Sequence, residues 1–121
     1  PMSNAHTRRT LLQIARSDTT FRVQDTPSGR AWVGRCLHCR TRHLLALDGT
    51  PLSAATIEHI LPRHHGGTDD LRNLAIACAA CNQGKGSRLD HRRADDPQLR
   101  EVVAALTAER LRRWRDPALI P

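Results

Sequence analysis

The stretch that decides the fold reads TIEHILPRHHGGTDDLRNLAIACAACNQGKGSR and covers residues 56–88. It begins in one short apolar run and contains a second, which predict strands at residues 54–60 and 74–77, separated by a polar loop with a Gly-Gly pair. The first predicted strand carries an acid and a histidine side by side, Glu58 and His59, near its end. A helix is expected after the second strand, so the stretch predicts two strands and a helix.

The four cysteines fall into two pairs with the same spacing, Cys36 with Cys39 and Cys78 with Cys81. Two residues between cysteines let a tight turn aim both sulfurs at one point, and four thiolates are typical of structural Zn²⁺. Disulfides and a thioredoxin-like redox pair are the alternatives, and the first fits poorly with a chain that shows no secretion signal. We expect a closed zinc site, with the nearby His38 and His43 as ordinary polar side chains rather than ligands.

The chain from Cys36 to Arg88 resembles the HNH endonuclease motif, in the variant with asparagine at the third position and zinc knuckles on either side. The elements that carry the resemblance are the acid-His pair, Pro62, Gly66-Gly67, Asp70-Leu71, Asn73, and Cys-x-x-Cys-Asn followed by Lys85-Gly86. The resemblance implies an α+β fold with a small ββα-metal (His-Me finger) core, a four-Cys structural zinc site and flanking helices. In that core the two strands pair antiparallel and the helix packs across them.

The resemblance also implies an activity, the metal-dependent hydrolysis of DNA phosphodiester bonds, and a role for each site residue. His59 matches the general base, a role that suits histidine because its ordinary pKa is about 6.5. Glu58 and Asn82 would hold one divalent ion, Mg²⁺ or Mn²⁺, and we expect these three side chains to surround that cation. Asn73 is expected to pin the loop through hydrogen bonds to backbone and so hold His59. Gly84, inside the expected helix, predicts a short or irregular helix.

The charge of the chain favours a polyanionic partner. Nineteen Lys and Arg against twelve Asp and Glu give a net charge of +7, and every cation but Lys85 is an arginine, which pairs bidentately with phosphate. We therefore expect DNA, in its double-stranded form, as partner, with Arg63, Lys85 and Arg88 as candidate phosphate contacts. Four further arginines crowd the end of the chain and are read either as DNA contacts or as a solvated face: Arg110, Arg112, Arg113 and Arg115.

The composition and the order of the predicted elements indicate one domain over residues 1–121. Hydrophobic residues make up 39% of the chain, which indicates a globular protein rather than a disordered one. The ββα core is expected at about 54–90, an N-terminal helix and hairpin at 7–47, and a C-terminal helix at 96–115. No apolar run approaches the roughly 20 residues that span a bilayer, and no signal peptide is recognised, so we expect a cytoplasmic protein without a membrane partner.

The sequence leaves a second function open, that of a non-catalytic, zinc-stapled module that binds nucleic acid. This module would share the zinc site and the charge, but it gives no reason for Glu58, His59 and Asn82 to occur together. A single-strand RNA-binding module is disfavoured because the aromatic residues that stack on bases are scarce. The oligomeric state is open as well, with a homodimer or a phage or host protein as the further partner.

Overall fold

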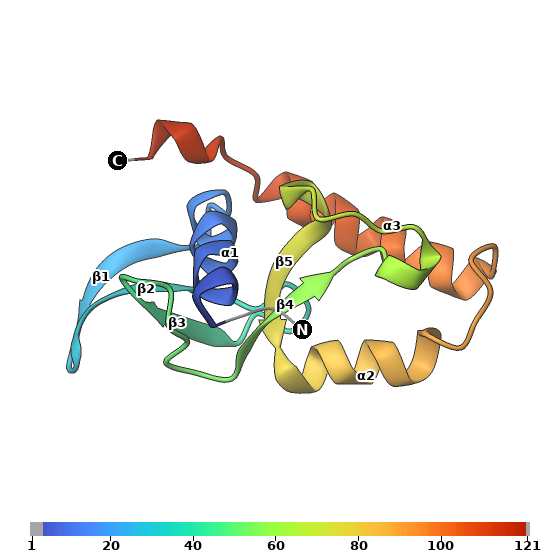
Figure 1. Ribbon diagram of the computed structural model, residues 1–121, viewed down its shortest axis with the longest axis horizontal. Coiled ribbons are helices and arrows are strands. Elements are labelled where there is room, and N and C mark those ends of the chain that lie inside the picture. The colour runs from blue at the N-terminus through green and yellow to red at the C-terminus, as the bar shows by residue number, and fades with distance from the viewer. Residues whose placement is uncertain (1–3, 121) are drawn as a thin grey trace.

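Residues 4–120, which the computed structural model describes, form two antiparallel sheets and three α-helices (Figure 1). In chain order the elements are α1 (Asn4–Arg16), β1 (Arg22–Thr26), β2 (Gly29–Arg35), β3 (Arg42–Ala46), β4 (Ala55–His59), β5 (Leu74–Cys78), α2 (Ala79–Leu89) and α3 (Pro97–Arg112). Strands β1, β2 and β3 make one sheet, and β4 and β5 make the other. The predicted α+β class, with a two-stranded sheet and helices, is confirmed.

The β4–β5–α2 unit follows the predicted order. β4 and β5 pair antiparallel, with Ala55 opposite Cys78 and His59 opposite Leu74. α2 begins directly after Cys78 and packs against both strands. The expected irregularity of this helix is wrong: α2 runs as one α-helix through Gly84, where an added Cβ would meet nothing within 4 Å. The helix is held to β4 and the loop after it through the next residue, Lys85, whose ammonium donates to the carbonyls of His59 and Ile60.

The main core lies between α1 and the inner face of the three-stranded sheet. Apolar residues at helical spacing on α1 pack there against residues of both sheets: Leu11, Ile14, Ala15, Phe21, Trp32, Leu45, Leu74 and Ile76. Gly34 of β2 is required by this packing, because a Cβ on it would lie 2.3 Å from the ring of Phe21. The single phenylalanine thus fills a space that the sheet leaves open for it.

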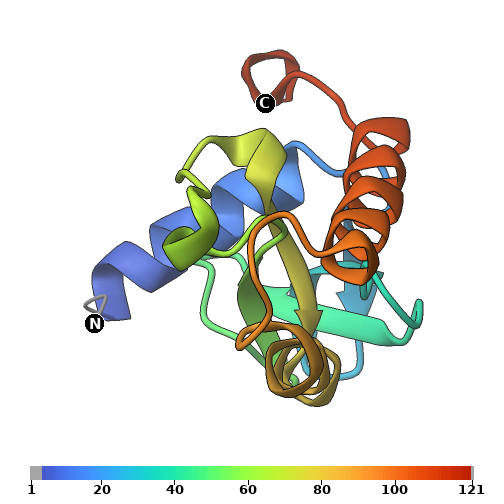
Figure 2. The same ribbon diagram turned by 90° about the vertical axis from the view of Figure 1, so that its right-hand side faces the viewer.

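α3 closes the other side of β5, so that α1 and α3 flank this strand (Figure 2). It begins after Asp96, whose carboxylate accepts hydrogen bonds from the amides of Gln98 and Leu99. Its apolar side packs through Leu106 onto a small second cluster that includes Ile60 of the loop after β4. The predicted helix at 96–115 is therefore present, and it ends three residues early.

Three of the four arginines at the end of the chain are structural: Arg110, Arg113 and Arg115. The interpretations as DNA contacts and as a solvated face are both wrong for the two buried ones, whereas Arg112 is exposed, pairs with Glu109 and stays open. Arg110 and Arg113 are 0% and 1% exposed, and their guanidinium groups donate to backbone carbonyls, among them Leu74 and Cys36. Arg115 likewise donates to the carbonyl of Phe21. These side chains satisfy carbonyls that strands and turns leave unpaired, which is why they turn inward rather than to solvent.

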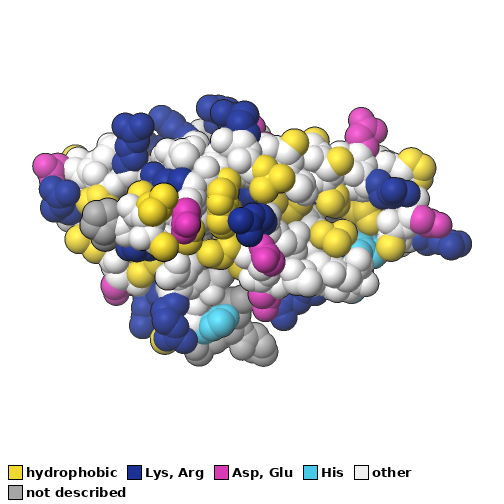
Figure 3. Space-filling view, turned by 90° about the horizontal axis from the view of Figure 1, so that it is seen from above, with side chains coloured by type: hydrophobic (Ala, Val, Ile, Leu, Met, Phe, Trp, Pro, Cys, Tyr) yellow, Lys and Arg dark blue, Asp and Glu magenta, His cyan; other side chains and the backbone are white. Residues whose placement is uncertain are grey.

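No helix within residues 4–120 is long and apolar enough to cross a membrane. Seen from above, the surface mixes basic, acidic and hydrophobic side chains without one dominant basic area (Figure 3). The net charge therefore does not by itself locate a partner on this face.

Candidate active site and metal centre

The four cysteines converge, as the spacing predicts. The four Sγ atoms lie within 4.8 Å of one another, close to the separation of about 3.8 Å that four Zn–S bonds of ≈ 2.3 Å in a tetrahedron give. Cys39 Sγ and Cys78 Sγ are 3.5 Å apart, far beyond the ≈ 2.05 Å of a disulfide, so these cysteines are free thiols. The cluster is a zinc-type site.

Three of the thiols differ in how readily they lose their protons. Hydrogen bonds from Thr41 lower the pKa of Cys39 to about 6, whereas burial raises the pKa of Cys78 to about 11 and that of Cys81 to about 12. Backbone amides of His38, Cys39 and Cys78 point at Cys36 Sγ from 3.3–3.5 Å. A bound metal ion would bring all four groups to the thiolate form.

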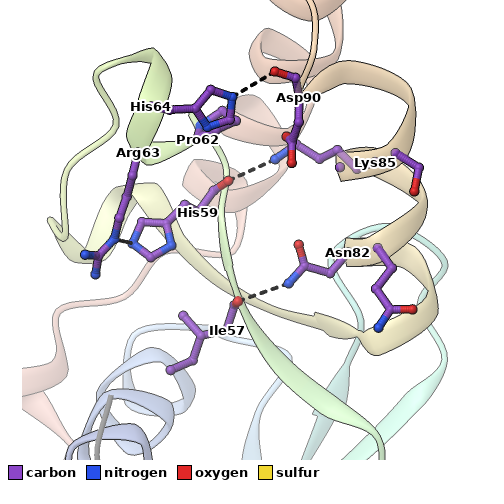
Figure 4. A pocket seen from close by; sticks show the side chains of 11 residues that line it. Ile57, His59, Pro62, Arg63, His64, Asn82, Lys85 and Asp90 are labelled. Carbon is purple, nitrogen blue, oxygen red and sulfur yellow. Dashed lines mark hydrogen bonds between the residues drawn. The ribbon is translucent and has the colours of Figure 1, made fainter. Parts of the chain in front are cut away.

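Glu58 and His59 point to opposite faces of β4, as neighbouring residues on a strand do. Figure 4 shows the His59 imidazole on one side of the strand and the side chains of Asn82 and Lys85 on the other. Together these residues line a hollow of about 710 Å³ at the end of β4, but Glu58 is fully buried and does not line it. The expectation that positions 58, 59 and 82 surround one point is therefore wrong.

The His59 ring is held through one nitrogen. Its Nε2 lies 2.8 Å from Asp69 Oδ1 and 3.1 Å from Arg63 Nε, and Arg63 also pairs with Asp69 at 3.0 Å. Asp69 accepts a hydrogen bond from Nε2–H when the ring carries a proton there, whereas Arg63 donates a hydrogen bond to Nε2 when it does not. The hydrogen bond from His59, followed by the charge of Arg63, lowers the pKa of Asp69.

Asp69 was missed by the sequence analysis. The predicted hairpin could have indicated it. Because His59 pairs with Leu74, the loop that connects the two strands must return to the end of β4, where His59 lies. A carboxylate in that loop then lies within reach of the ring. Arg63, predicted as a phosphate contact, is engaged by the same carboxylate.

Asn73 makes the backbone hydrogen bonds that were predicted for it. Its Oδ1 accepts from the amide of Leu61 at 2.8 Å, and its Nδ2 donates to the carbonyls of Leu61 at 3.1 Å and Thr68 at 2.8 Å. The side chain therefore ties both ends of the loop that carries Arg63 and Asp69. Gly67 is needed in the same loop, because a Cβ there would lie 1.7 Å from the carbonyl oxygen of Leu61.

Glu58 belongs to a buried charged network. Its Oε1 pairs with His38 Nε2 from the first knuckle, and its Oε2 lies 3.2 Å from Lys85 Nζ. Lys85 is 3% exposed and donates to the carbonyls of His59 at 2.9 Å and Ile60 at 2.8 Å. The ammonium is thus held by two hydrogen bonds and one buried ion pair, so its predicted role as a phosphate contact is wrong. Arg88, exposed and bonded to Gly84 O of its own helix, stays a prediction.

Glu58 and Asn82 each have an oxygen of the kind that binds a hard cation, but the ammonium of Lys85 already lies beside Glu58. Glu58 Oε2 is buried without a hydrogen bond, and no hydrogen bond within residues 4–120 reaches the amide oxygen of Asn82, whose Nδ2 is bound to Ile57 O at 3.1 Å. Carboxylate and amide oxygens are ligands that Mg²⁺ accepts. The amide oxygen of Asn82 is therefore available to an ion in the hollow, whereas Glu58 could join it only if the ion replaced the ammonium of Lys85.

Two further histidines lie beside these sites, His64 at the hollow and His43 at the cysteine cluster. His64 lines the hollow, and its Nε2 lies 2.9 Å from the carbonyl oxygen of Asp90 at the end of α2. His43 lies with Nε2 3.1 Å from Cys78 Sγ and with Nδ1 2.7 Å from Ser53 Oγ, and burial lowers its pKa. The neutral ring of His43 therefore supports the cysteine cluster from its sheet.

Comparison with known proteins finds one family. Residues 36–88 match the family model described as HNH endonuclease, which confirms the resemblance carried by the same residues. No curated protein matches the chain. No solved structure matches it either.

Proposed function

Taking the HNH match of residues 36–88 as the premise, we propose that the protein is a metal-dependent endonuclease that hydrolyses phosphodiester bonds of double-stranded DNA. The observation that carries the proposal is the state of His59. Its imidazole borders an open hollow at a strand end and is oriented by Asp69, while Asn73 fixes the loop around it. A structural histidine would not need an orienting carboxylate beside an open cavity.

Hydrolysis requires a group that takes a proton from the attacking water. Both hydrogen-bonding partners of the His59 ring meet Nε2, so Nδ1 is the nitrogen that accepts this proton. Asp69 then stabilises the imidazolium by receiving the Nε2–H hydrogen bond, and it holds the ring in one orientation throughout. Arg63 keeps Asp69 ionised and in place.

The divalent ion, Mg²⁺ or Mn²⁺, would be held at the hollow by Asn82, with Glu58 as a second ligand only where the ion displaces the ammonium of Lys85. When bound, it supplies positive charge to the phosphate oxygens on which negative charge develops. Asn82 is positioned for this by its own hydrogen bond to β4, which leaves its amide oxygen uncommitted. The resemblance implies products with 5′-phosphate and 3′-hydroxyl ends.

The test is nicking of supercoiled plasmid across a panel of divalent ions, with His59→Ala beside the parent protein. We expect the variant to lose about 10²–10⁴-fold in rate, the contribution of a positioned base, with unchanged zinc content and fold. His91→Ala is the matched control, because His91 is an exposed histidine after α2. Full activity of His59→Ala refutes the base assignment, and inactivity of the parent with every ion favours the non-catalytic nucleic-acid-binding module.

A further inference from the structure

Most arginines of this chain are committed to partners inside the molecule. Among residues 4–120 the guanidinium groups that make no hydrogen bond, ion pair or ring contact belong to Arg8, Arg9, Arg22, Arg35, Arg42 and Arg100. Among the described residues these are the arginines that can meet an anion without giving up a partner. Their location says more about a partner than the net charge does.

Three of these arginines lie together on the outer face of the three-stranded sheet. Arg35 of β2 stands directly opposite Arg42 of β3, and Arg22 of β1 stands opposite Val33, two residues from Arg35. Opposed side chains have their Cβ atoms about 4.5–5.5 Å apart, and diagonal ones about 7–8 Å apart. We call these three exposed residues the sheet arginines.

The sheet arginines lie on the side of the sheet that α1 does not cover. Gly34, the neighbour of Arg35, faces the Phe21 ring in the core, so the alternation of the strand directs Arg35 outward. Like charges placed directly opposite each other destabilise a sheet, and no acidic side chain of the described chain forms an ion pair with them. Folding alone thus gives no reason for this arrangement.

We propose that the sheet arginines form a second contact surface for duplex DNA, which holds the phosphate backbone away from the cleavage point. The inference rests on the proposed function in taking DNA as the polyanion. Guanidinium groups bind phosphate bidentately, and three of them on a rigid sheet match about three neighbouring phosphates, spaced about 3.4 Å per strand along the duplex axis.

The zinc-type site joins this surface to the hollow. Arg35 and Arg42 border the first knuckle, since Arg35 precedes Cys36 and the amide of Cys36 bonds to the carbonyl of Thr41. Cys78 of the second knuckle is the N-cap residue of α2, which carries Asn82. A duplex held at the sheet arginines is therefore held by an element that is fixed, through the cysteines, to the wall of the hollow.

The experiment measures binding of a short DNA duplex as a function of salt, in protein that carries His59→Ala so that the duplex stays intact. Each lost phosphate contact makes the slope of log K against log salt shallower by about 0.9. We expect the triple variant Arg22→Gln, Arg35→Gln, Arg42→Gln to lose about 2 to 3 units of slope, and to bind about a hundredfold more weakly at 0.1 M salt. Its thermal stability should be unchanged or slightly higher, because the opposed charges are gone.

The matched control is Arg30→Gln, Arg93→Gln, Arg100→Gln, which removes the same charge from other exposed positions; Arg30 and Arg93 are paired with Asp25 and Asp95. An equal loss in both triple variants, or an unchanged slope in the first, overturns the proposal. Preference for single-stranded DNA or duplex RNA at the sheet arginines overturns it as well. Binding that depends on these residues in a protein whose parent cuts no DNA supports this inference and refutes the nuclease instead.

Discussion

Two neighbouring residues, Glu58 and His59, occupy opposite environments one position apart on β4. The carboxylate is fully buried between His38 and Lys85, while the imidazole borders an open hollow beside Asp69. A strand turns successive side chains to opposite faces, so one face can hold a fixed charged network while the other holds a reactive group. The comparison teaches that an acid-His pair in a sequence need not be one unit in space.

The largest expected effect is on stability, and it comes from removing Lys85 from the buried network around Glu58. Lys85→Met removes the cation beside the buried Glu58 carboxylate, which keeps only His38 as a partner, and leaves two backbone carbonyls without their donor. We therefore expect the free energy of unfolding to fall by about 3–5 kcal/mol. Urea unfolding followed by circular dichroism measures it. Arg88→Met, on the exposed side of the same helix, is the control and should change stability by less than about 0.5 kcal/mol.

The double variant Lys85→Met, Glu58→Gln tests whether the loss of stability comes from the charge of Glu58. Removing this charge as well should restore part of the lost stability, because the penalty lies in the buried carboxylate that has lost its cation. A double variant that is less stable than Lys85→Met contradicts the assignment of the network as a buried ion pair.

The next largest effect on stability is expected in the loop between β4 and β5. Asn73→Ala removes three hydrogen bonds to backbone and leaves the amide of Leu61 unsatisfied, so unfolding should become easier by about 2–3 kcal/mol. Hydrogen exchange of the Leu61 amide reports it locally. Exchange that is as slow in the variant as in the parent argues against the pinning role.

The variant Asp69→Asn tests the interaction between His59 and Asp69 on the open face of β4. Loss of the charge that orients His59 should slow plasmid nicking by about tenfold to a hundredfold, part of what a positioned base contributes, with little change in stability. Asp95→Asn, an exposed aspartate paired with Arg93, is the control. Equal rates for Asp69→Asn and the parent show that His59 does not depend on the carboxylate.

Glu109, which is partly exposed, can be compared with the buried Glu58, and its charge should have the smallest effect on stability. Hydrogen bonds from Arg112 and Arg113 lower its pKa to about 2. A depressed pKa adds stability that is present above the ordinary value of about 4.5 and is lost as the pH falls towards 2. For this partly exposed group the contribution is below about 1 kcal/mol. The stability difference between the parent and Glu109→Gln, measured by urea unfolding from pH 5 to pH 2.5, should shrink with falling pH; zinc loss affects both proteins alike.

The parts of the molecule that depend on local spacing could be predicted from the sequence. The Cys-x-x-Cys pairs brought four sulfurs together, and the apolar runs at 54–60 and 74–77 became β4 and β5 with one or two residues of difference. Asn73 was expected from the family resemblance, and its hydrogen bonds stay within its own loop. In each case the information lies within a few residues of the position that it concerns.

The role of a charged side chain could not be predicted, because contacts distant in sequence decide it. Arg110 reaches Ser17, 93 residues away, and Lys85 reaches Ile60, 25 residues away. Both look in the sequence like surface cations near a phosphate site. Burial turns them into donors for backbone carbonyls, and only the fold shows which carbonyls are left to receive them.

The way in which Arg110 and Arg113 bind has a consequence for how this chain can diverge. Most of their acceptors are main-chain oxygens, which every amino acid supplies, so Leu74, Leu71 and Arg35 can be exchanged without loss of these bonds. The arginines have no such freedom, because lysine lacks the planar fork that reaches several oxygens at once. These hydrogen bonds therefore constrain the identity of the two arginines, and they place no constraint on the side chains of the residues that accept them through the main chain.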